Sequence, residues 1–316
     1  MNKKIFTDVL FIFLAFALFV MWYEGKFEHR EVTTTPAQNF TVYLITMHKS
    51  SDYWFIMNHG ASDMADLLGV TYKWDAPIVR NVDEQIDIIK NAVSAGADAL
   101  MIAASDPERL SGVIEDAKKA GVKIIYVDAP ANAEGIVTLS TDNYAAGITA
   151  GETMIFELKA IGIKAGTIGI VSLPQETITT MNREKGFRDA IKKDGEYTIL
   201  DTRYTTGDIT MTQEAAEAFI KENPNLVGLF GTSETTTIGV GNAIKASNKN
   251  IVGIGFDITK TIQEMIDAGY IKAVMVQNPY TMGYLGMAEA FAALNGYNTG
   301  PPFLNTGVKV RTQYSH

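Results

Sequence analysis

The 316-residue sequence contains no cysteine, and this absence excludes several kinds of chemistry. A chain without cysteine has no disulfides, no thiolate nucleophile and no zinc–thiolate site, and it offers no cysteine for lipid attachment. Positive charge is also scarce: 27 Lys and Arg residues stand against 36 Asp and Glu residues, which gives a net charge of −9. Such a chain has no basic excess to neutralise a phosphate backbone, so we expect no nucleic-acid partner.

Sequence motifs of enzymes are lacking as well. No Gly-rich dinucleotide fingerprint follows a predicted strand, and the sequence has neither a phosphate-binding loop nor a nucleophile elbow. The four histidines, His29, His48, His59 and His316, do not have the spacing of metal ligands on one element. We therefore predict that the protein is not an enzyme and that it uses no cofactor and no metal.

An apolar run covers residues 5–23, and as a helix these 19 residues would be about 28 Å long, close to the thickness of a membrane core. A cleaved signal peptide and a retained anchor are the two interpretations. No small-residue pair for a signal peptidase follows the run closely, whereas Trp22 and Tyr23 suit a membrane interface and Lys3 and Lys4 place the N-terminus inside. We favour the anchor, and hence a single-pass protein of the cell membrane with its C-terminal domain extracellular.

The rest of the chain has a regular pattern. Residues 1–4 would form a cytoplasmic tip and residues 24–40 a polar linker. From residue 41 onward, short β-branched runs alternate with amphipathic stretches, which is typical of repeated βαβ units in a parallel sheet covered by helices on both faces. The predicted strands are residues 41–47, 70–73, 99–103, 122–127, 138–140, 167–171, 197–203, 226–230, 251–256, 273–276 and 307–310. The predicted helices are residues 53–68, 82–95, 107–120, 143–161, 182–193, 210–222, 236–246, 259–267 and 280–294.

The pattern of strands and helices begins a second time near residue 143. We therefore predict an α/β protein with two doubly wound parallel-sheet lobes behind an N-terminal transmembrane helix. The N-terminal lobe would comprise residues 41–142 plus 278–306, and the C-terminal lobe residues 143–277 plus 307–316.

Polar and aromatic side chains gather after the predicted strands, at the carboxyl ends where doubly wound sheets bind ligands. Aromatic rings, carboxylates and amides suit a sugar, because a sugar ring has two apolar faces and a rim of hydroxyl groups. Other roles stay open, because an Asp or Gln at a strand end can cap the next helix and Trp54 can belong to the core. The candidate ligand-binding residues are Lys49, Ser51, Tyr53, Trp54, Asp128, Ser233, Asp257 and Gln277.

Several stretches of this sequence together resemble the ribose-binding branch of the type I periplasmic sugar-binding proteins. The resemblance extends over residues 41–310 and implies a Venus-flytrap architecture with a pentose or hexose in the cleft. It is carried by residues 41–47, 124–128, 141–143, 183–187 and 253–257. It also implies three crossovers between the lobes, which we expect near residues 128–141, 257–259 and 277–278.

The resemblance implies roles for single residues. Tyr53 and Trp54 match the family's stacking aromatic pair. Asp128 and Asp257 match its two hydroxyl-binding carboxylates, and Gln277 matches the amide at the last crossover.

At other positions the sequence departs from the family. Ser51 and Ser233 stand where the family usually has asparagine. The arginine that usually follows the first carboxylate is Ala129, and Met181 takes the place of a second ligand arginine, which argues against ribose. We expect Lys49 to supply the missing cation, because a lysine at this position also occurs in xylose-type relatives.

With a retained peptide anchor and no cysteine to lipidate, the chain resembles the membrane-anchored xylose-binding sensors that pair with a histidine kinase, although the lobe motifs themselves do not indicate this. We therefore predict an extracytoplasmic receptor for a pentose, with D-xylose first, that signals through the ectodomain of a histidine kinase in a two-component system regulating sugar uptake. The alternative is the substrate-binding component of an ATP-binding-cassette importer. Its partner would be a sugar permease, and its ligand a pentose, a hexose or autoinducer-2.

Overall fold

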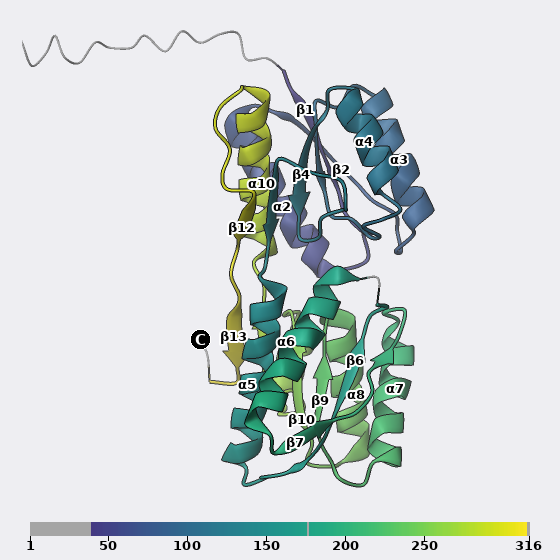
Figure 1. Ribbon diagram of the computed structural model, residues 1–316, viewed down its shortest axis with the longest axis vertical. Coiled ribbons are helices and arrows are strands. Elements are labelled where there is room, and N and C mark those ends of the chain that lie inside the picture. Colours follow the sequence, from purple (N-terminus) through teal and green to yellow (C-terminus); the bar gives the residue numbers. More distant parts are fainter. Residues whose placement is uncertain (1–38, 176, 315–316) are drawn as a thin grey trace, which may run out of the picture. The chain divides into compact units, whose positions relative to one another are not determined.

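The structure is a computed structural model that describes residues 39–175 and 177–314. The predicted cytoplasmic tip, the predicted anchor and residues 24–38 of the predicted linker lie outside the described residues. The described part of the chain contains two sheets, each covered by helices (Figure 1).

Six strands form the first sheet, and we call this sheet with its helices the N-terminal lobe. The strands are β1 (Thr41–Ile45), β2 (Thr71–Asp75), β3 (Ala99–Ile102), β4 (Lys123–Val127), β5 (Val137–Ser140) and β12 (Phe303–Asn305). The helices are α2 (Asp52–Leu68), α3 (Val82–Ser94), α4 (Ser111–Lys119) and α10 (Pro279–Leu294). The strand order is β12-β5-β4-β3-β1-β2, and all neighbouring strands are parallel.

The second sheet with its helices is called the C-terminal lobe. Its strands are β6 (Gly166–Ser172), β7 (Tyr197–Ile199), β8 (Arg203–Tyr204), β9 (Leu226–Gly231), β10 (Val252–Phe256), β11 (Ala273–Val276) and β13 (Lys309–Thr312). Its helices are α5 (Asn143–Ala160), α6 (Ile178–Asp194), α7 (Ile209–Glu222), α8 (Glu234–Ser247) and α9 (Lys260–Asp267). The order is β13-β11-β10-β9-β6-β7, with β8 also on β6, and among these pairs of strands only β11–β13 is antiparallel.

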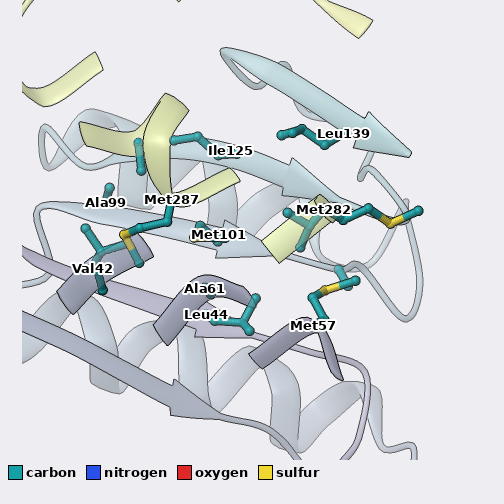
Figure 2. Close-up of a cluster of buried hydrophobic side chains, with 14 of the residues drawn as sticks. Val42, Leu44, Met57, Ala61, Ala99, Met101, Ile125, Leu139, Met282 and Met287 are labelled. Atoms are coloured by element: carbon teal, nitrogen blue, oxygen red, sulfur yellow. The ribbon is translucent and has the colours of Figure 1, made fainter. Parts of the chain in front are cut away.

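Both faces of the first sheet are apolar because side chains alternate along each strand. In β1, Val42 and Leu44 point to the face covered by α2 and α10, while Tyr43 and Ile45 point to the face covered by α3 and α4. Figure 2 shows the first of these cores, in which methionines of α2 and α10 lie over the aliphatic side chains of the sheet. Burial of these apolar surfaces is the main stabilising contribution to the lobe.

Helices α2 and α10 pack closely because glycines lie at their contact. A Cβ atom on Gly60 would stand 2.1 Å from the Tyr280 carbonyl oxygen, and one on Gly283 would stand 2.0 Å from the Met57 carbonyl oxygen. Since only glycine lacks this atom, the two backbones approach directly. This contact fixes α10, which follows the crossover at residues 277–278, against α2, which carries the predicted aromatic pair.

The predicted α/β class with two parallel, helix-covered sheets is confirmed, and three local expectations are corrected. The predicted strand at residues 197–203 is divided into β7 and β8. The predicted tail strand at residues 307–310 lies two residues later, as β13 in the second sheet, and the structure adds β12 in the first sheet, with Gly307 at a φ of 77° between them. No crossover lies at residues 257–259, because β10 and α9 both belong to the C-terminal lobe.

The chain passes between the lobes at residues 141–142, 277–278 and 306–308. The exact boundaries of the two lobes stay a prediction.

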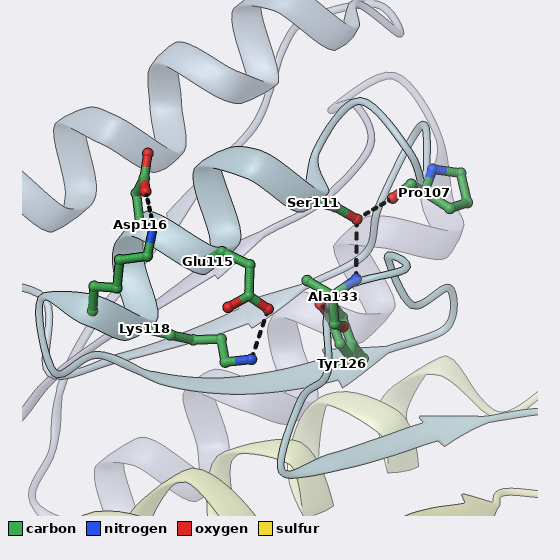
Figure 3. Close-up of polar contacts among 8 residues, drawn as sticks. Pro107, Ser111, Glu115, Asp116, Lys118, Tyr126 and Ala133 are labelled. Carbon is green, nitrogen blue, oxygen red and sulfur yellow. Dashed lines mark hydrogen bonds and ion pairs between the residues drawn. The ribbon is translucent and has the colours of Figure 1, made fainter.

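The loop that follows β4 is held to α4 by short polar contacts, which Figure 3 shows. The Ser111 hydroxyl accepts the Ala133 N–H at 3.0 Å and donates to the Pro107 carbonyl at 2.7 Å. From the other side, the Tyr126 hydroxyl donates to the Ala133 carbonyl at 2.7 Å. Asp128 is the first residue of this loop, so its position depends on a braced segment.

Candidate functional site

A cavity of about 540 Å³ lies at the carboxyl ends of strands from both sheets. Its volume is in the range of small-molecule sites. Seven of the eight predicted ligand-binding residues line it, and they come from both lobes: Ser51, Tyr53, Trp54, Asp128, Ser233, Asp257 and Gln277.

Lys49 is the exception among the predicted residues. It does not appear in the lining of the cavity within the described part of the chain. Its Nζ lies 2.8 Å from Oδ1 of Asp75 and 5.7 Å from the centre of the Trp74 ring. Both partners lie at the end of β2, the parallel neighbour of β1. The lysine side chain therefore contacts β2 and does not line the cavity. The structure therefore does not place the expected cation in the cavity.

Asp128 and Asp257 occupy equivalent positions in the two lobes. Each directly follows its strand, β4 or β10, and each has a left-handed backbone, with φ values of 66° and 67°. Each backbone N–H is held by a carbonyl of the neighbouring strand: Asp128 by Leu139 at 2.8 Å, and Asp257 by Met275 at 2.9 Å. A non-glycine residue in this conformation costs about 1–3 kcal/mol, and such strain is typical of functional positions.

The alternative role of helix caps does not apply to these residues. Thr259 is the N-cap of α9, and Asn278 is the N-cap of α10, so neither Asp257 nor Gln277 takes that position. Asp128 is followed by β5 rather than by a helix.

The aromatic pair lies in the first turn of α2. The Ser51 hydroxyl caps this helix by accepting the Tyr53 N–H at 3.2 Å. The Tyr53 and Trp54 rings meet edge to face at 4.9 Å, the Tyr53 hydroxyl donates to Asp128 Oδ1 at 2.7 Å, and the Trp54 indole N–H donates to His48 Nε2 at 3.2 Å. Trp54 is only 5% exposed and packs into the core, and it also lines the cavity, so its role toward a ligand stays a prediction.

Gln277 connects a crossover between the lobes to the cavity. Its Nε2 donates to Asp257 Oδ1 at 2.9 Å, and this bond fixes the orientation of the amide because a carboxylate is an acceptor. Its buried Oε1 receives no hydrogen bond from the described residues. A buried acceptor of this kind usually finds a partner in a ligand or an ordered water.

The structure adds cavity residues that sequence analysis did not predict. The Ser51 hydroxyl donates to Glu234 Oε2 at 2.7 Å, and Arg80 Nη1 donates to Thr177 Oγ1 at 2.9 Å. Each of these bonds joins the N-terminal lobe to the C-terminal lobe. No local pattern pointed to them, since 183 residues separate Ser51 from Glu234 along the chain.

Arg183 also lines the cavity but directs its donors into its own lobe. Its Nε donates to Asn143 Oδ1 at 2.7 Å, its Nη1 donates to the Thr232 carbonyl at 2.9 Å, and its guanidinium lies 4.1 Å from the centre of the Phe256 ring. It is 3% exposed. Arg183 therefore braces α5, α6 and the ends of β9 and β10 beneath the cavity.

The cavity has an unusual electrostatic balance. Burial raises the pKa of Asp128 to about 6, although the Arg183 charge and the Tyr53 hydrogen bond oppose this rise. Burial also raises the pKa of Asp257 and of Glu234. Beside Trp54, burial and the positive charge of Arg80 lower the pKa of His48 to about 4, so this imidazole is neutral at pH 7. Among the described residues there is no group of side chains that could hold a metal ion.

The model of the periplasmic binding protein domain matches residues 42–298. The chain belongs to the periplasmic binding protein family. It is 24% identical to the D-allose-binding periplasmic protein of Escherichia coli over 264 residues, which cover 79% of this chain and 83% of that one.

Solved structures of periplasmic binding proteins share the fold. A carbohydrate transporter solute binding protein from Agrobacterium radiobacter, in complex with D-arabinose, has a TM-score of 0.83 and 28% identity over 87% of this chain and 95% of that one. The periplasmic component of a sugar transport system from Hahella chejuensis has a TM-score of 0.81 and 30% identity over 85% and 99%. The predicted type I fold and the prediction that the chain is not an enzyme are thereby confirmed.

The predicted location is corrected. A single-pass protein of the cell membrane with an extracellular C-terminal domain does not agree with relatives that are named as periplasmic proteins. Within residues 39–175 and 177–314, no helix combines the length and the apolar character that crossing a membrane requires. The run at residues 5–23, on which the expectation depended, lies outside the described residues.

Proposed function

We propose that this periplasmic binding protein is the ligand-binding component of an ATP-binding-cassette sugar importer and that its ligand is a monosaccharide. The observation that carries the proposal is the equivalent placement of Asp128 and Asp257. They bring one carboxylate from each lobe to the same cavity, next to the aromatic pair. Carboxylates bind sugar hydroxyls through charge-assisted hydrogen bonds, and the aromatic rings offer an apolar surface to a sugar ring.

The two-lobed arrangement supports a closing motion around the ligand. A sugar that contacts both carboxylates binds the closed form more tightly than the open one, and it therefore shifts the equilibrium toward closure. A closed, loaded receptor presents a different surface to a permease than an open one. The proposed partner is accordingly a sugar permease.

For the ligand we propose a pentose, either D-arabinose or D-xylose. The support is the similarity to the Agrobacterium radiobacter protein, whose structure holds D-arabinose, together with the absence of arginine at residues 129 and 181. No observation on the described residues favours signalling through a histidine kinase, and we do not take up that expectation.

Isothermal titration calorimetry with D-xylose, D-arabinose, D-ribose, D-glucose and D-galactose tests the proposal. We expect saturable binding of at least one pentose, and chromatography should recover the sugar unchanged. Failure of all five to bind at millimolar concentration would overturn the proposed function, and turnover of the sugar would overturn it independently.

A further inference from the structure

The hydrogen-bond donors around the cavity are directed mostly toward the protein. Arg183 donates to Asn143 and Thr232, and Arg80 donates to Thr177 and to the Ser105 carbonyl. Two guanidinium groups thus line the cavity while their donors hold its walls together.

The polar groups of the aromatic side follow the same pattern. The Tyr53 hydroxyl donates to Asp128, the Ser51 hydroxyl donates to Glu234, and the Trp54 N–H donates to His48. Because the indole N–H is only a donor, His48 Nε2 is the acceptor, and His48 Nδ1 accepts the Ser50 backbone N–H at 3.3 Å and lies 2.9 Å from the Ser50 hydroxyl.

Acceptor capacity, by contrast, is plentiful. An ionised carboxylate accepts about four hydrogen bonds. Asp128 accepts one from the Tyr53 hydroxyl, Asp257 accepts one from Gln277, and Glu234 accepts one from Ser51. All three keep unused acceptor positions at the cavity.

Negative charge exceeds positive charge in the lining of the cavity, because the carboxylates of Asp128, Asp208, Glu234 and Asp257 stand against the guanidinium groups of Arg80 and Arg183. None of these carboxylates takes part in an ion pair with another described residue. Arg183 lies close enough to stabilise the charges of Asp128 and Asp257. Asp257 and Asp52 add negative charge near Glu234, whose side chain accepts a hydrogen bond from the neutral Ser51 hydroxyl. Lys49, the expected cation, is held by Asp75.

From this distribution we propose that the cavity selects its ligand by charge. A sugar that carries an ammonium group binds more tightly than its neutral parent, and a sugar acid or sugar phosphate binds far more weakly. The ammonium site is the Glu234 side of the cavity, where the carboxylate has unused acceptor positions and forms no ion pair with another described residue. This inference rests on the proposed function and names the class of ligand within it.

Simple electrostatics gives the expected size of the effect. Two like charges about 5 Å apart at an effective dielectric constant of about 20 weaken binding by roughly two orders of magnitude. The gain for an ammonium is smaller, about tenfold, because the ammonium must lose its hydration when it enters the cavity. The expected order of affinity is therefore amino sugar, neutral sugar, sugar acid.

The test compares sugars of one stereochemistry and different charge by calorimetry at pH 7. One series is D-xylose, D-glucose, D-glucosamine and D-glucuronate, and the other is L-arabinose, D-galactose, D-galactosamine and D-galacturonate. The methyl esters of the two uronates keep the shape of the acids without their charge. Calorimetry at a pH above the pKa of the amine, where the amino sugar is uncharged, provides the same control for the amino sugars. Glu234→Gln should reduce the ratio of the affinities for the amino sugar and the sugar acid by at least tenfold. Glu264→Gln, on the exposed surface of α9, should leave this ratio unchanged.

Different results would overturn charge selection and the proposed function. An acid that binds as tightly as its neutral parent, or an amino sugar that binds more weakly at pH 7 than in its uncharged form, would overturn charge selection and leave sugar binding in place. If a sugar acid and its uncharged methyl ester both fail to bind, the cavity excludes the acid by its shape rather than by its charge. This result would also overturn the inference. If no member of either series binds, and none of the five sugars tested above binds either, the proposed function itself falls.

Discussion

The Ser51 hydroxyl donates a 2.7 Å hydrogen bond to the Glu234 carboxylate, and this bond links the first turns of α2 and α8 across the cavity. The same hydroxyl accepts the Tyr53 N–H as the N-cap of α2. Both helix N-termini carry partial positive charge, and the Glu234 carboxylate stabilises both. One serine thus combines the local capping of a helix with contact between the lobes.

We expect Ser51→Ala to weaken sugar binding about tenfold, because the closed form loses a hydrogen bond to a charged group. The free energy of unfolding should also fall by about 1 kcal/mol with the loss of the cap. Calorimetry measures the first effect and urea unfolding the second. Thr259→Ala is the matched control, because Thr259 caps α9 by accepting the Ile262 N–H and does not appear in the cavity lining. An equal loss of affinity in both variants would contradict the role of the link.

Asp257→Asn should weaken binding of a neutral sugar about 10–100-fold, since it replaces charged hydrogen bonds of about 1.5–3 kcal/mol by neutral ones. The fold should persist, because the asparagine carbonyl still accepts the bond from Gln277. Asp201→Asn, at an exposed position outside the cavity, controls for the loss of one negative charge. Unchanged affinity in Asp257→Asn would remove this residue from the ligand-binding site.

The pKa of Asp128 predicts a dependence of stability on pH. In the folded state this pKa is raised from 3.8 to about 6, so between these values the folded protein holds a proton that the unfolded chain releases. Stability from this group therefore falls as the pH rises from about 4 to 6. Asp128→Asn removes the effect, and its free energy of unfolding should exceed that of the parent by up to about 3 kcal/mol above pH 6 and match it below pH 4.

His48 should produce the opposite slope, because its folded pKa is lowered from 6.5 to about 4. In this window the unfolded chain binds the proton and the folded protein does not, so stability falls as the pH drops. His48→Gln should therefore gain stability over the parent on acidification from pH 6.5 to 4. Urea unfolding of the parent and both variants across pH 3.5–7.5 measures the two differences. If the two stability differences between variant and parent change with pH in the same direction, Asp128 and His48 do not control the pH dependence of stability.

The packing of α2 against α10 gives a test of the fold. Gly60→Ala places a methyl group 2.1 Å from the Tyr280 carbonyl oxygen, and the backbones must separate to accommodate it. We expect the free energy of unfolding to fall by about 1–3 kcal/mol or more. Gly112→Ala in α4 is the control, because nothing lies within 4 Å of its added Cβ and alanine favours a helix. It should raise stability by about 0.5–1 kcal/mol, and a similar loss in both variants would contradict the packing argument.

Much of the fold was predictable from the sequence because the alternation of strands and helices follows from local periodicity. The strand TVYLI at Thr41–Ile45 is apolar on both faces, as a central parallel strand must be, and it lies where its pattern indicated. The tail was harder to predict. Short segments such as β12 and β13 carry little periodic signal, and Gly307 between them allowed the chain to move from one sheet to the other.

By itself the sequence determined the strand ends at which polar side chains gather, because those ends are set by apolar runs and by residues such as Asp128 that terminate them. The tertiary structure alone decided which of these side chains meet. It paired Lys49 with Asp75 and drew it away from the cavity, and it brought Glu234 to Ser51 across 183 residues. Such pairings depend on the register of neighbouring strands and on the approach of two lobes, and neither is encoded in the local pattern around the residues concerned.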